Sequence, residues 1–108
     1  MFALGDLQFE TMDRVNALSI YTKMLSRALD RNASADVIAT CAKLVRRADR
    51  RLARWVRAHI HDLDLRLRDS VAIARVLANA ALVRAKAYIA EANKNGKQKK
   101  RKGAQKQG

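Results

Sequence analysis

Apolar residues recur every three or four positions through most of this chain, and residues 6–95 contain neither glycine nor proline. That spacing gathers apolar side chains on one side of an α-helix, and the lack of strong turn formers argues against an all-β fold. The pattern therefore predicts an all-α protein. We expect an antiparallel three-helix bundle with helices of roughly 25, 27 and 30 residues joined by short turns.

The first predicted helix extends from about Asp6, a candidate N-cap, to about Arg31. Its apolar side carries Leu4, Val15, Leu18, Leu25 and Leu29, with Thr11 and Thr22 on the same track. A weaker second stripe carries Phe9, Ile20 and Met24. Residues 30–36 cluster polar turn formers, and Ser34 is a good N-cap for the second helix because its hydroxyl can accept a first-turn N–H.

The second break is less sharply marked. Residues 61–69 alternate polar and apolar positions, and either Asp62 or Asp64 can cap a third helix. An apolar track crosses this junction through Val56, Ile60, Leu63, Leu67, Val71 and Ala74. It favours an alternative fold, a helical hairpin in which one long second helix covers residues 35–93. The final helix is predicted to end at residues 93–96, where asparagine and glycine offer C-cap chemistry.

The third predicted helix is apolar on two sides. One seam carries Ile73, Val76, Ala80, Val83 and Ala87, and the roughly opposite seam carries Val71, Ala78, Leu82, Ala85 and Ile89. No helix of a three-helix protomer is surrounded on all sides, so a second apolar side indicates contact with another chain. We therefore expect a homodimer formed through the third helix.

The formal net charge of +13 comes mainly from two segments. Residues 35–61 contribute +5 and residues 94–108 contribute +7, while residues 1–34 are neutral and residues 62–93 contribute +1. Residues 94–108 contain no apolar residue larger than alanine, so we expect a helical domain over 1–93 and a disordered lysine-rich tail over 94–108. The tail residues expected to bind anions are Lys97, Lys99, Lys100, Arg101 and Lys102.

The second predicted helix separates its charges from its apolar residues. Its buried side is predicted to carry Ile38, Cys41, Val45, Ala48, Leu52, Trp55 and His59. On the opposite side lies a set that we name the arginine row: Lys43, Arg46, Arg47, Arg50, Arg54 and Arg57. Without Arg46 these bases occupy a sector about 80° wide and span about 21 Å. Only Asp49 offers an internal partner for the row, and helical spacing places it near Arg46 and Arg50.

Like charges on one helix face repel, so an almost acid-free row indicates an anionic partner. The planar guanidinium of arginine binds two phosphate oxygens at once, and flexible lysines bind a phosphate backbone without sequence choice. We expect a small accessory or architectural protein that binds the backbone of DNA or RNA. The alternative is an adaptor or inhibitor that docks its basic face on an acidic protein.

An enzyme is not expected, since no phosphate-binding loop, nucleophile set or catalytic carboxylate pair is present. The segment from Arg54 to His59 has an R-x4-H spacing and is similar to the motif of the small helical HEPN ribonucleases. The similarity covers six residues, and Trp55 follows the arginine where those enzymes usually carry a polar residue. A HEPN-like ribonuclease is therefore the least favoured hypothesis.

Cysteine and histidine usage limits other chemistry. The lone Cys41 excludes an internal disulfide framework and suits a reducing compartment. His59 and His61 lie two residues apart and do not share a helix face, so we expect neither a metal site nor a cofactor. The sequence shows neither the charge pattern of a signal peptide nor an apolar run of membrane-spanning length, so we expect a cytoplasmic protein associated with nucleic acid.

Overall fold

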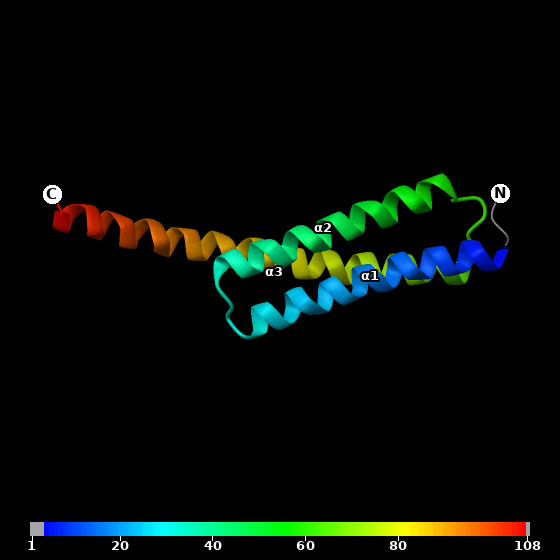
Figure 1. Cartoon of the computed structure of the whole chain (residues 1–108), viewed down its shortest axis with the longest axis horizontal. Coiled ribbons are helices and arrows are strands. Elements are labelled where there is room, and N and C mark those ends of the chain that lie inside the picture. The colour runs from blue at the N-terminus through cyan, green and yellow to red at the C-terminus, as the bar shows by residue number, and fades with distance from the viewer. Residues whose placement is uncertain (1–3, 108) are drawn as a thin grey trace.

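The computed structural model of the chain contains three helices, α1 (Leu4–Asp30), α2 (Ala35–Ala58) and α3 (Leu65–Gln107). The structure describes the backbone of residues 4–107 and the side chains of residues 5–94. The helices run up, down and up, so that α2 is antiparallel to α1 and α3, and α3 continues past the other two (Figure 1). The predicted all-α fold is confirmed, and the described backbone contains no strand.

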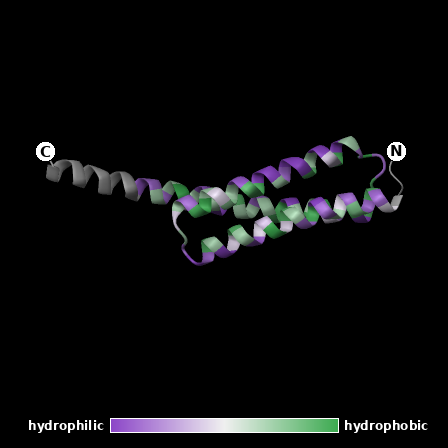
Figure 2. Ribbon diagram, viewed as in Figure 1, coloured by the Kyte–Doolittle hydropathy of each residue, from purple (hydrophilic) through white to green (hydrophobic). Residues whose placement is uncertain are grey.

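One apolar core runs along the inside of the bundle, and hydrophilic and hydrophobic positions alternate along each helix (Figure 2). Its buried members are Val15, Leu18, Leu25, Leu29, Ile38, Ala42, Val45, Ala48, Leu52, Val71, Ala74, Ala78, Ala81 and Ala85. The predicted apolar side of α1 is confirmed, although the side chain of Leu4 lies outside the described residues. Thr11 and Thr22 are buried on the same track, where each hydroxyl donates a 2.7 Å hydrogen bond to the carbonyl four residues earlier.

The turn between α1 and α2 follows from two polar residues. Asn32 adopts a positive φ of 56°, a left-handed conformation that asparagine tolerates better than most residues. The amide of the next residue, Ala33, then donates to the carbonyl of Ala28 and closes the end of α1. Ser34 caps α2 as predicted, since its side chain accepts a hydrogen bond from the Val37 amide.

The alternative of one long helix over residues 35–93 is wrong. α2 ends at Ala58, and α3 begins at Leu65 with the Asp64 carboxylate accepting a 2.8 Å hydrogen bond from the Leu67 amide. Leu63 is buried in the turn with Leu7 and Leu67. The apolar track across the junction therefore continues into a folded turn that closes this end of the bundle, which a straight helix would leave open.

The two apolar sides of α3 have different surroundings. The seam that includes Val71, Ala78 and Ala85 faces the core, with Leu82 and Ile89 half-buried at its edge. Every residue of the other seam, from Ile73 to Ala87, is exposed. α3 continues to Gln107, beyond the end predicted at residues 93–96, because Lys, Gln and Arg are good helix formers and each of its two glycines costs only about 1 kcal/mol. The disordered state of the tail stays a prediction.

No helix among the described residues is long and apolar enough to cross a membrane.

Candidate functional site

The arginine row lies on the side of α2 that faces away from the core. All six residues of the row are exposed, whereas Ile38, Val45, Ala48 and Leu52 on the opposite side are buried. Cys41, Trp55 and His59, which were predicted on the buried side, are half-buried at its margins. Among the side chains the structure describes, no member of the row forms an ion pair. The row is therefore a set of neighbouring cations without an internal counter-charge.

The one acid within this stretch of α2 does not neutralise the row. Asp49, only 16% exposed, accepts hydrogen bonds of 2.8 and 3.3 Å from Arg75 of α3. Asp49 was the one internal partner expected for the row, but its carboxylate binds Arg75 of α3 instead of Arg46 or Arg50. The hydrogen bond to Asp49 raises the pKa of Arg75 above its ordinary value, against the opposing effect of partial burial.

Two further bases that the sequence reasoning left out, Arg51 and Lys86, extend the basic surface. Arg51 is exposed and lines a groove between α1 and α2 together with Arg47 and Arg14. On the other flank, Lys86 of α3 lines the groove between α2 and α3 together with Arg46. Arg51 could have been found from its helical angle, about 40° from the edge of the row. Lys86 lies on α3, so only the folded arrangement brings it to the row.

Acidic groups limit this surface on the side of α1. Glu10 and Asp13 line the same groove as Arg47 and Arg51. Glu10 is already bound to Arg14, with 2.8 Å between its Oε2 and the arginine Nη1. The basic surface is therefore bounded toward α1 and open toward solvent and toward α3.

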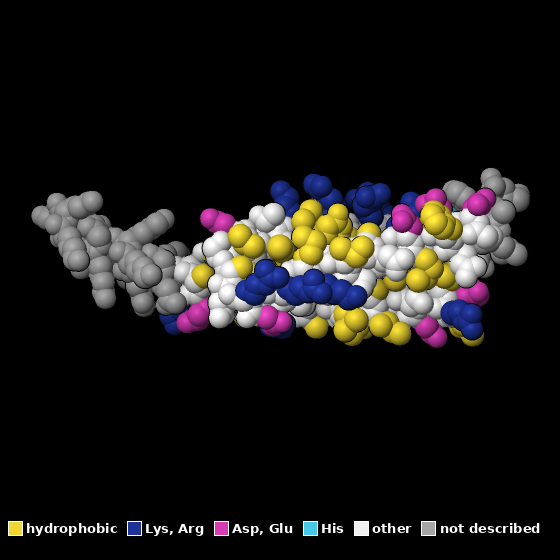
Figure 3. Space-filling view, turned by 60° about the horizontal axis from the view of Figure 1, so that its bottom comes forward, with side chains coloured by type: hydrophobic (Ala, Val, Ile, Leu, Met, Phe, Trp, Pro, Cys, Tyr) yellow, Lys and Arg dark blue, Asp and Glu magenta, His cyan; other side chains and the backbone are white. Residues whose placement is uncertain are grey.

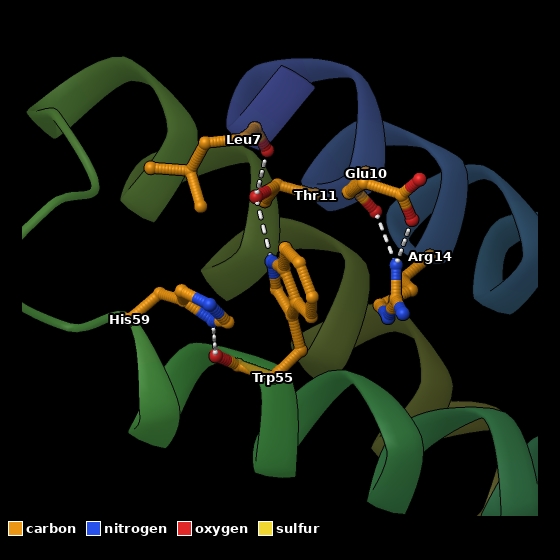
Figure 4. A network of polar contacts seen from close by, with 6 residues as sticks. All are labelled: Leu7, Glu10, Thr11, Arg14, Trp55 and His59. Atoms are coloured by element: carbon orange, nitrogen blue, oxygen red, sulfur yellow. Dashed lines mark hydrogen bonds and ion pairs between the residues drawn. The ribbon is translucent and has the colours of Figure 1, made fainter. Parts of the chain in front are cut away.

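Trp55 joins α2 to α1 (Figure 4). Its indole Nε1 donates a 2.8 Å hydrogen bond to the Thr11 hydroxyl, which in turn donates to the Leu7 carbonyl. The guanidinium of Arg14 lies 4.0 Å from the centre of the indole ring, a cation–π contact. Both the ring and its N–H are thus engaged within the bundle, which favours a structural role for Trp55 over base stacking.

His59 and Arg54, the pair with the R-x4-H spacing, do not share an environment. His59 is the C-cap of α2, its ring lies 4.0 Å from the Trp55 ring, and its Nδ1 is 3.0 Å from the Trp55 carbonyl oxygen. Arg54 is exposed at the groove that Trp55 and Arg51 also line. Within the described residues no three metal-ligating side chains come together, His59 and His61 included.

The predicted tail site lies outside the described side chains. This applies to Lys97, Lys99, Lys100, Arg101 and Lys102, which belong to α3 by its backbone. Lys94, the last side chain described, is exposed.

Replacing Trp55 by phenylalanine should lower the free energy of unfolding by at least about 1 kcal/mol, since it removes the hydrogen bond to Thr11 and replaces the indole by a smaller ring. Urea unfolding followed by far-ultraviolet circular dichroism measures this change. Thr11→Val provides the partner for a double-mutant cycle. The two substitutions should be less than additive, whereas full additivity would mean that the hydrogen bond contributes nothing.

Comparison of the chain with protein-family models, with curated proteins and with solved structures finds no significant match.

Proposed function

We propose that the protein binds the phosphate backbone of nucleic acid through the arginine row of α2. The observation that carries this proposal is the row's lack of an internal counter-charge, since Asp49, the one acid within that stretch of α2, is bound to Arg75 of α3. Seven exposed bases, the row and Arg51, lie between residues 43 and 57. Their mutual repulsion destabilises the free protein and is relieved when phosphates lie between them.

The dimensions of the row suit a polyanion. It spans about 21 Å along α2, a length over which a DNA duplex carries roughly 12 phosphate charges. Guanidinium groups held on one helix can bind several of these phosphates and release their counterions. Asparagine and glutamine, which read adenine, are absent from the row, so the contacts support backbone binding rather than selection of a base sequence.

We also propose that the binding species is a homodimer. The apolar seam of α3 that faces solvent supports this proposal, because Ile73, Val76 and Val83 are 61, 66 and 69% exposed. Exposed apolar faces of this kind mark sites of association. Figure 3 shows one face of the bundle, on which hydrophobic side chains form several groups on both sides of a band of lysine and arginine.

Titration of duplex DNA and of single-stranded RNA at several salt concentrations tests the function. Five phosphate contacts from the row should give a slope of about −4.5 for log K against log salt concentration on duplex DNA, and the tail should make this slope steeper. Deleting residues 97–108, which contain six bases, should reduce the slope and weaken binding to all sequences alike while measurable binding remains. Complete loss of binding on this deletion would contradict the role of the row and favour an adaptor that docks on an acidic protein.

A further inference from the structure

The outer face of α3 carries an uncharged strip from Ala72 to Ala90. Its members, all exposed, are Ala72, Ile73, Val76, Ala80, Val83, Ala87 and Ala90, and we name them the α3 strip. They recur every three or four residues on the side of the helix opposite the buried Ala78. At 1.5 Å per residue the strip is about 27 Å long.

We propose that a second copy of the chain packs on the α3 strip in the antiparallel direction, which places the arginine rows of both copies on one side of the dimer. The pairing itself depends only on α3. Its consequence for binding rests on the proposed function of the row.

Side-chain size favours the antiparallel direction. The larger members Ile73 and Val76 precede the middle of the strip, and the small members Ala87 and Ala90 follow it. A two-fold axis between residues 81 and 82 brings Ile73 opposite Ala90 of the second copy and Val76 opposite Ala87, so that large side chains meet small ones. Parallel pairing would bring each residue against its own equivalent, with crowding at one end and voids between alanines at the other.

Charge favours the same direction and the same register. Asp69 and Lys94 are exposed at the two ends of the strip, and the axis that pairs Ile73 with Ala90 also brings Asp69 opposite Lys94. Parallel pairing would oppose Asp69 to Asp69 and Lys94 to Lys94. It would also bring together two copies of residues 97–108, each with six bases and no acid, whereas antiparallel pairing separates them at opposite ends of the dimer.

The direction of pairing determines where the basic surfaces lie. A two-fold axis perpendicular to α3 leaves the α2 helices of both copies on the same side of the paired α3 helices. With helices packed 8–10 Å apart, the two rows are roughly 20–25 Å from each other. Lys86, which lines the groove between α2 and α3 together with Arg46, then lies between the two rows. One nucleic acid crossing the dimer can contact both, which a parallel dimer, with its rows on opposite sides, would not permit.

Disulfide trapping without nucleic acid tests the pairing, in a Cys41→Ala background. Mixed Ile73→Cys and Ala90→Cys chains should cross-link on oxidation. Ile73→Cys alone should not, because its two copies lie about 25 Å apart in the antiparallel dimer. Sedimentation should give about twice the chain mass of 12.1 kDa. Cross-linking of Ile73→Cys to itself, or a monomer at high micromolar concentration, would overturn the proposal.

A matched pair of substitutions tests the shared basic surface. Val83→Glu puts a charge into the α3 strip and should yield a folded monomer, while Ile20→Glu, at a similarly exposed apolar site on α1, should remain dimeric. The monomer should bind duplex DNA at least tenfold more weakly, with a shallower salt dependence. A monomeric Val83→Glu that binds as tightly as the wild type would refute the shared surface. If neither the wild-type dimer nor the Ile20→Glu dimer binds nucleic acid, the proposed function is refuted, while the pairing shown by disulfide trapping still stands.

Discussion

Replacing Arg47, Arg50 and Arg54 together by glutamate should weaken duplex DNA binding by roughly 500-fold at 0.1 M salt. The expectation follows from the loss of three phosphate contacts, each contributing about 0.9 to the log–log salt slope. The slope of log K against log salt concentration therefore falls by about 2.7. Because the electrostatic contribution approaches zero near 1 M salt, this change over a tenfold lower salt concentration gives the roughly 500-fold loss at 0.1 M. Helicity should be retained, because all three side chains are exposed and lie opposite the buried Val45 and Leu52. Fluorescence anisotropy with a labelled duplex measures both affinity and slope.

A control variant separates the row from net charge. Lys23, Arg27 and Arg66 are exposed bases outside the row, and their replacement by glutamate changes the formal charge by the same six units. This variant should lose far less affinity, since it leaves the row intact. An equal loss in both variants would show that only the total charge matters. Unchanged DNA binding by the row variant would instead indicate an acidic protein as the partner.

The helices could be predicted from sequence because each depends on local order. Ser34 and Asp64 cap α2 and α3 through contacts to residues three positions ahead, and the buried face of α2 follows the helical period. The turn between α2 and α3 could not be decided in the same way. The positions of Leu63 and Leu67 fit one continuous helix as well as two helices joined by a turn. The contact of Leu63 with Leu7 of α1, which stabilises the turn, exists only in the folded bundle.

The arginine row could be predicted for the same reason, since its members share one helix and one face. The partner of Asp49 could not, because Arg75 is distant in sequence and reaches Asp49 only when α3 packs beside α2. Lys86 extends the basic surface from α3 and carries no sequence signal of this role. A single-helix pattern therefore identifies the centre of such a surface, while its edges depend on helix packing.

Replacing Ile38 by alanine should destabilise the protein by about 2–4 kcal/mol, because it leaves a cavity in a closely packed core. Ile38 is fully buried near the start of α2 and belongs to the same core cluster as Leu25 and Leu29 of α1. For a domain of this size, that loss corresponds to a fall in Tm of roughly 10 °C or more. Calorimetry at matched protein concentration measures it, since self-association makes Tm depend on concentration.

The neighbouring residue supplies the control. Val37 is 47% exposed, so Val37→Ala should change stability by no more than about 0.5 kcal/mol. It removes little packing, and alanine has the higher helix propensity. The two substitutions lie side by side in the first turn of α2, so their difference isolates burial from position in the helix. A loss of stability in Val37→Ala as large as that in Ile38→Ala would mean that α2 turns a different face to the core. The arginine row would then not lie on its solvent side.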